Sequence, residues 1–141
     1  MYLFNRSITV HVCSVDENTV TVNGTFLDSH HELCLTLEVD LNIYTIISAH
    51  GELRRAPHTD CRHTQERIKE LIGVNLNYNV RKQIQAAVGL ECGCTHLTDL
   101  ALECVKGVVQ AKFHLMRLKM PPEDLKLQVE QQLKGSCWHF K

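Results

Sequence analysis

The stretch Glu32-Leu33-Cys34-Leu35-Thr36-Leu37-Glu38-Val39 has an apolar residue at every second position. Side chains of a β-strand point alternately to opposite faces, so this spacing predicts a strand with one buried face and one polar face. No other part of the chain alternates so clearly. A strand of this kind needs neighbours, because two-stranded pairing alone is marginally stable in water.

The segments on either side of this strand supply those neighbours. A short polar connection leads to a strand over residues 43–53, and two earlier alternating segments predict strands over 7–15 and 19–27. Polar residues 16–18 separate the earlier two as a turn, which indicates a hairpin. We therefore expect an N-terminal antiparallel sheet of three to four strands.

The second half of the chain has the spacing of helices. Pro57 removes a backbone donor and biases the preceding residue away from helix, which marks the end of the sheet. Apolar residues then recur at three- and four-residue steps, which predicts three to four helices. Their expected ranges are Asp60 or Thr64 to Ile72 with a stop at Gly73, Val80 to Val88 capped by Asn79, Thr95 to Pro121, and Glu123 to Lys134. The predicted fold class is α+β.

Size and composition fit one folded domain. The chain has 141 residues with 44% apolar and 22% charged residues, which is ordinary for a globular protein. We expect a single domain over 1–141, with the sheet in 1–55, the helices in 60–134 and a tail in 135–141. The sequence contains no internal repeat.

Charge and hydropathy exclude several partners. The net charge is -1 and the basic residues are scattered, so we expect no nucleic acid partner. The chain has no apolar run long enough for a membrane span and its first residues lack an export signal, so we expect no membrane association and a cytoplasmic location. Seven cysteines, an odd number at irregular spacing, argue against a disulfide framework and leave burial, metal binding or reactivity.

One segment gathers the residue types that bind metals. Glu91-Cys92-Gly93-Cys94-Thr95-His96 offers three soft or borderline donors at the entrance of a helix. Zinc and iron–sulfur centres take thiolate and imidazole ligands, usually from separate segments, and Cys61 is the natural second contributor. The predicted metal ligands are Cys61, Cys94 and His96, with Cys92 and His31 as additional candidates, and the predicted cofactor is zinc or an iron–sulfur cluster.

Three alternatives remain for these cysteines. Cys92 and Cys94 can be packing residues, as we expect for Cys13, Cys34 and Cys104. Cys94 can instead be the nucleophile of an enzyme or sulfur carrier, because a helix N-terminus favours the thiolate. The third alternative is a binding module that docks a protein partner. The sequence decides neither whether the protein is an enzyme nor its oligomeric state.

Two resemblances arise from these residues. Arg55-x-Pro57 followed by Cys61, and then residues 93–97 reading Gly-Cys-Thr-His-Leu, resemble a bacterial family of uncharacterised proteins over residues 25–109. This resemblance implies a bacterial cytosolic origin and no established activity.

The order of elements also resembles NifU-type (IscU-like) iron–sulfur scaffolds. The resemblance implies that Cys61 matches the loop cysteine of the scaffold and Cys94 the cysteine that opens its later helix. The chain departs from the scaffolds at residues 29–31, which read Ser-His-His where scaffolds carry Cys-Gly-Asp. His31 or His96 would then complete a mixed Cys and His site, so the sequence indicates a metal-binding or sulfur-handling protein.

Overall fold

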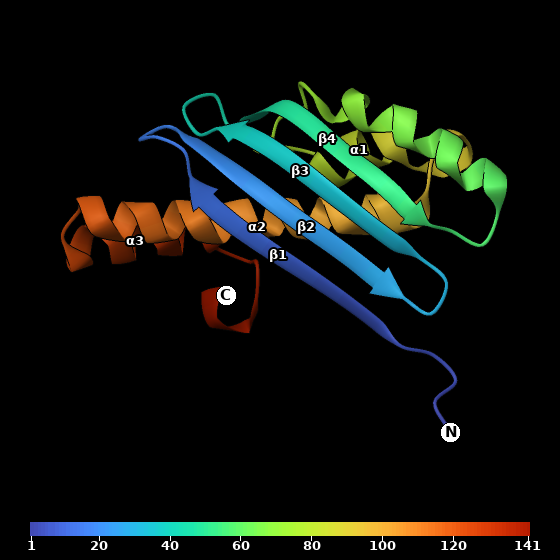
Figure 1. Cartoon of the computed structure of the whole chain (residues 1–141). Coiled ribbons are helices and arrows are strands. Elements are labelled where there is room, and N and C mark those ends of the chain that lie inside the picture. Colours follow the sequence, from blue (N-terminus) through green and yellow to red (C-terminus); the bar gives the residue numbers. More distant parts are fainter. The chain divides into compact units, whose positions relative to one another are not determined.

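The computed structural model of residues 1–141 begins with an antiparallel sheet of four strands in the order β1-β2-β3-β4 (Figure 1). The strands are β1 (Arg6–Ser14), β2 (Thr19–Asp28), β3 (Glu32–Asp40) and β4 (Thr45–Arg55). Each strand pairs with the next one along the chain, so the sheet is a meander closed by short turns. The turn between β2 and β3 lies at the same end of the sheet as the last residue of β4, because Glu32 at the start of β3 pairs with Arg55.

One face of this sheet carries the core. The alternating apolar residues of β3 are each at most 1% exposed, namely Leu33, Leu35, Leu37 and Val39. Val22 of β2 pairs with Leu37, so the neighbouring strand places its own apolar residues on the same face. Period-two alternation in the sequence thus becomes a continuous buried surface.

Helices cover that face within the first of two compact units, residues 1–108. They are η1 (Thr59–Leu71), α1 (Val80–Val88), η2 (Leu90–Cys92) and the first part of α2 (Thr95–Lys119), and Figure 1 shows them on one side of the sheet. A side chain at Gly24 of β2 would run into Cys104 and Leu100 of α2, so the absence of a side chain there allows the helix to lie against the strand.

The second compact unit, residues 109–141, has helices and no strands. It holds the end of α2, the helix α3 (Pro122–Leu133) and the short η3 (Trp138–Phe140). Pro122 stands in the first turn of α3, where its missing donor costs nothing. None of the residues of α3 is buried. That residues 1–141 form a single domain stays a prediction, which the division into two compact units does not test.

The structure confirms the α+β fold class and corrects three local expectations. The last strand starts at Thr45 rather than Ile43, because Tyr44 adopts a positive φ of 52° and extends the turn. The first helix is expected to end at Ile72, but that element is a 3₁₀ helix that ends at Leu71. Three residues per turn align Ile68 with Leu71 and leave Ile72 beyond the helix end, 50% exposed.

The third correction concerns Asn79 at the start of α1. A capping side chain requires an extended backbone at the cap. Asn79 instead has φ 47° and its side chain makes no capping hydrogen bond, so only its carbonyl serves the helix, accepting from the backbone N–H of Gln83 at 3.0 Å.

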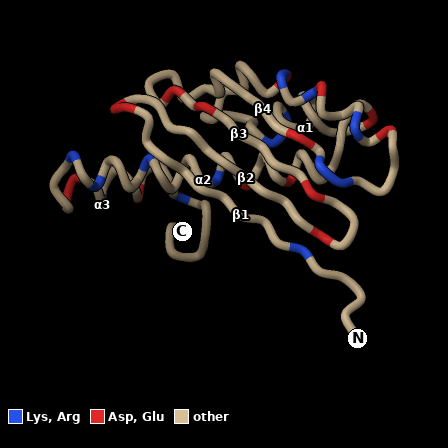
Figure 2. The backbone as a smooth tube through the Cα atoms, in the orientation of Figure 1, with Lys and Arg blue, Asp and Glu red and all other residues tan.

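Charges are dispersed along the chain. Figure 2 shows Lys and Arg interspersed with Asp and Glu over strands and helices alike. None of the helices has the length and apolar character that crossing a bilayer requires. The expectation that no nucleic acid is bound stays a prediction.

Candidate functional site

A cavity of about 330 Å³ lies where the β2–β3 turn, the end of β4, η1 and the entrance of α2 meet. Its wall combines apolar side chains with imidazoles and thiols. The lining residues are His31, Leu33, Leu53, Arg55, Ala56, Pro57, His58, Cys61, Thr64, Gly93, Cys94 and His96. Three segments far apart in the sequence therefore contribute polar donors to one concave surface.

Four of the five predicted ligands line this cavity. They are His31 from the β2–β3 turn, Cys61 from η1, and Cys94 with His96 from the entrance of α2. Cys92 does not line it. Cys92 is exposed and borders a separate cavity of about 600 Å³ beside the end of α1.

The loop before α2 fixes the position of Cys94. A side chain at Gly93 would collide with the carbonyl of Val88, so this position accepts only glycine at the observed approach. The backbone N–H of Cys94 then donates to the Val88 carbonyl at 2.7 Å. The Cys94 carbonyl accepts from the backbone N–H of Thr98 at 3.0 Å and from its hydroxyl at 3.1 Å. Cys94 therefore stands immediately before α2, and its carbonyl accepts the first hydrogen bond of the helix.

His96 lies between the thiol of Cys94 and the ring of His31. The Sγ atom of Cys94 is 3.8 Å from Nδ1 of His96. The ring of His96 meets the ring of Phe26 edge-on at 5.2 Å between centroids, and it lies 3.8 Å from the ring of His31. Burial, with the nearby charge of His31 second, lowers the pKa of His96 below its ordinary value. A neutral imidazole at this place has a lone pair available.

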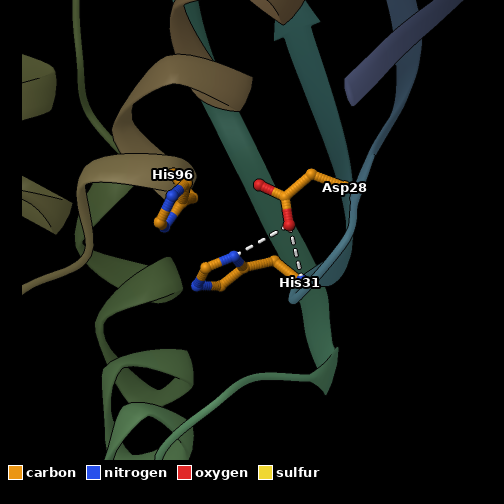
Figure 3. A group of neighbouring side chains, drawn as sticks. All are labelled: Asp28, His31 and His96. Atoms are coloured by element: carbon orange, nitrogen blue, oxygen red, sulfur yellow. Dashed lines mark hydrogen bonds and ion pairs between the residues drawn. The ribbon is translucent and has the colours of Figure 1, made fainter. Parts of the chain in front are cut away.

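Asp28 is the residue of this site that the sequence analysis missed. Asp28, His31 and His96 each offer an atom within 4.8 Å of the others (Figure 3). Asp28 directly follows the strand expected over 19–27, and no role was predicted for it from the sequence. The available signal was the order Asp-Ser-His-His itself, because an aspartate that precedes a turn accepts hydrogen bonds from the backbone two and three residues later.

The carboxylate of Asp28 is buried but remains charged. Burial raises its pKa, and this effect is outweighed by hydrogen bonds from the backbone of His30, from the side chain and backbone of His31, and from Arg6. The net result is a pKa well below the ordinary value of 3.8. The group is therefore an anion at neutral pH, and Nδ1 of His31 must donate to it, at 3.0 Å.

Arg55 holds the backbone of this turn in place. Its guanidinium donates to the carbonyls of Ser29 and Asp28 at 2.8 Å each and to that of His31 at 3.3 Å. The last residue of β4 is thereby joined to the β2–β3 turn that carries two residues of the site. Three carbonyl partners occupy the donors of this arginine that face the turn.

The comparison with known families places the chain in a family without an assigned activity. Residues 4–110 match the family described as protein of unknown function (DUF2889), and the chain belongs to this family. The matched residues include every residue that lines the cavity. No curated protein and no solved structure matches the chain. The similarity to NifU-type scaffolds therefore stays a prediction.

Proposed function

We propose that the protein binds a divalent transition metal ion, zinc in the first place, through Cys61, Cys94, His31 and His96. The proposal is carried by one observation, the 3.8 Å separation of Cys94 Sγ and His96 Nδ1 at a cavity that Cys61 and His31 also line. Two ligands on one tetrahedral zinc, with bonds of about 2.3 and 2.0 Å, stand roughly 3.5 Å apart. A small movement of the side chains brings this pair to that separation. Cys61 and Cys94 lie outside the group of ligand atoms within 4.8 Å of one another, which Asp28, His31 and His96 form, so a four-coordinate site requires larger side-chain movements.

The chemistry of the four donors supports the same ion. Thiolate and neutral imidazole are the ligands that zinc takes in closed four-coordinate sites. His96 contributes a neutral ring, since burial lowers its pKa, and metal binding requires the unprotonated form. An iron–sulfur cluster is the second group that cysteine and histidine ligands hold, and it is the alternative occupant of this proposal. A cytosolic location belongs to the proposal too, because thiols stay reduced there.

Metal analysis of anaerobically purified protein tests the proposal. We expect about one equivalent of zinc or iron per chain, lost in Cys61→Ser and in Cys94→Ser. Cys92→Ser is the matched control, because Cys92 borders the other cavity and its loss leaves the metal content unchanged. Below roughly 0.2 equivalents in the wild type, after incubation with excess zinc, the proposal fails.

The contact between Cys94 and His96 favours a second candidate, an enzyme or sulfur carrier. In it, the thiol of Cys94 gives its proton to His96 and attacks the carbonyl carbon of an acyl substrate or the outer sulfur of a sulfane, and the displaced group leaves with the proton from His96. This candidate predicts a metal-free protein in which Cys94 is alkylated much faster than the exposed thiol of Cys13. Equal alkylation rates for the two thiols in metal-free protein would exclude it.

A further inference from the structure

The carboxylate of Asp28 accepts four hydrogen bonds, three of them on one oxygen. Its Oδ1 accepts from the backbone N–H groups of His30 and His31 at 2.8 and 2.7 Å and from Nδ1 of His31 at 3.0 Å. Its Oδ2 accepts from Arg6 Nη2 at 3.1 Å. Each carboxylate oxygen offers about two lone-pair positions, so Oδ1 is saturated by its three hydrogen bonds, whereas Oδ2 keeps one position beside its bond from Arg6. Asp28 lies close to His31 and His96, and the oxygen that holds His31 is not free to be a ligand.

The same hydrogen bonds determine which nitrogen of His31 carries a proton. An ionised carboxylate only accepts, so the Nδ1 that faces it must be the donor. The neutral ring then has its lone pair on Nε2. Figure 3 shows Nδ1 turned toward Asp28 and the other ring nitrogen on the far side of the ring. Histidines that bind metals usually donate their second nitrogen to a carboxylate in this way, which fixes the tautomer and the ring orientation.

The backbone that carries both residues is held independently of any ion. Arg55 donates to three carbonyls of the segment from Asp28 to His31, and the side chain of Asp28 is only 1% exposed. A ligand held by such contacts loses little conformational freedom when it binds a metal. The turn therefore has the properties of a prearranged support for one ligand.

We infer that Asp28 is the positioning residue of the proposed metal site, holding His31 as the Nδ1–H tautomer so that Nε2 binds the ion. This inference rests on the proposed function and deepens it. It assigns His31 as a ligand through one defined atom, and it places Asp28 outside the coordination sphere. It also predicts that the negative charge of Asp28 strengthens metal binding without contact between carboxylate and ion.

Zinc affinity of Asp28→Asn, measured by competition with a chromophoric chelator, tests the inference. The amide keeps an oxygen that accepts from the backbone and removes the charge that holds His31. We expect roughly 10- to 100-fold weaker zinc binding with unchanged one-to-one stoichiometry. The cobalt(II) absorption spectrum should stay the same, because the ligands are the same. The matched control is Asp16→Asn, in the β1–β2 turn, where an aspartate also accepts from a backbone N–H, at 2.8 Å from Asn18. This control should bind zinc like the wild type.

Nitrogen NMR of the metal-free protein gives a second, independent measurement. We expect His31 of the wild type as the Nδ1–H tautomer, and Asp28→Asn to populate the Nε2–H form. The wild-type spectrum suffices should the variant fail to fold.

The outcomes separate this inference from the proposed function. A wild type that binds no zinc overturns the proposed function, and the inference with it. A wild type that binds zinc while Asp28→Asn binds equally well overturns the inference alone. A changed cobalt spectrum in Asp28→Asn, or His31 found as the Nε2–H tautomer, also overturns the inference alone.

Discussion

The imidazole rings of His31 and His96 lie with their centroids 3.8 Å apart and their planes inclined by 34°. One ring comes from the turn between β2 and β3 and the other from the first turn of α2, so only the folded chain brings them together. Two like charges at this separation repel each other, and protonation of one ring opposes protonation of the other.

We expect His96 to titrate below its ordinary pKa in the metal-free protein. Burial is the larger cause and the charge of His31 the second, so His31→Gln should raise the pKa of His96 without restoring it fully. Proton NMR of the ring resonances over a pH series measures both proteins. A pKa of His96 at or above 6.5 in the wild type would contradict the prediction.

The lowered pKa of His96 also has a consequence for stability. The unfolded chain takes up this proton at higher pH than the folded chain, so the free energy of unfolding falls as pH drops through about 6.5. The fall ends once the pH lies below the folded pKa. His96→Gln should make this part of the curve flatter, which urea unfolding at several pH values would show.

Asp28 should contribute strongly to stability at neutral pH. Asp28→Ala removes the acceptor of two backbone N–H groups and of Arg6, and we expect a loss of about 3 kcal/mol in the free energy of unfolding. Asp28→Asn keeps part of these bonds and should lose about 1–2 kcal/mol. Urea unfolding near neutral pH measures both losses. Equal stability of Asp28→Ala and the wild type would contradict the role of these hydrogen bonds.

The pH dependence of Asp28 has a defined sign. Its folded pKa lies below the ordinary value of 3.8, so its stabilisation is complete above that value and is lost as the pH falls further, through the folded pKa. The advantage of the wild type over Asp28→Asn should therefore shrink on acidification below about pH 3.8. An advantage that instead grows in acid would show that the carboxylate is not held as an anion.

The sheet could be predicted from the sequence because its signal is local. Leu33, Leu35 and Leu37 alternate with polar residues, and a strand converts this order directly into one buried face. The start of β4 after Tyr44 could not be predicted, because a positive φ at a non-glycine residue is imposed by the surrounding turn. The 3₁₀ geometry of η1 is similarly a result of packing, since helical spacing in the sequence does not distinguish three from 3.6 residues per turn.

The site could be predicted only in part, because some of its contacts are local in the sequence and others form only in the folded chain. Cys94 and His96 lie two residues apart in sequence, and the glycine before them marks a loop, so their signal was local. Asp28 has a local partner in His31, three residues further on, but Arg6 on β1 reaches it only after the strands have paired. An aspartate in a turn is common on protein surfaces, and no local pattern reveals that this one is buried.

Cys104 should be the least reactive of the seven thiols. It is fully buried on α2, and burial, with the charge of Glu103 second, raises its pKa to about 12. We expect iodoacetamide to leave Cys104 unmodified in the folded protein while it modifies the exposed Cys13, as peptide mass spectrometry would show. Denaturation in guanidinium should equalise the two rates. Rapid modification of Cys104 in folded protein would contradict the packing of α2 against the sheet.

The close approach between β2 and α2 can be tested at Gly24. A Cβ atom there would overlap Cys104 Sγ and lie 2.9 Å from Leu100 Cδ1, so Gly24→Ala should destabilise the protein by about 1–3 kcal/mol. In an ordinary strand the same substitution is neutral or favourable, because alanine restricts the unfolded chain more than glycine does. A loss of stability in Gly24→Ala, rather than a gain, therefore indicates the contact between β2 and α2.

Cys104→Ala alone should also destabilise the protein, because it leaves a small cavity. The double variant should lose less than the two single losses together, by roughly 1 kcal/mol, since the added methyl group fills the space that the sulfur leaves. Strictly additive losses in urea unfolding would show that strand and helix do not meet at this point.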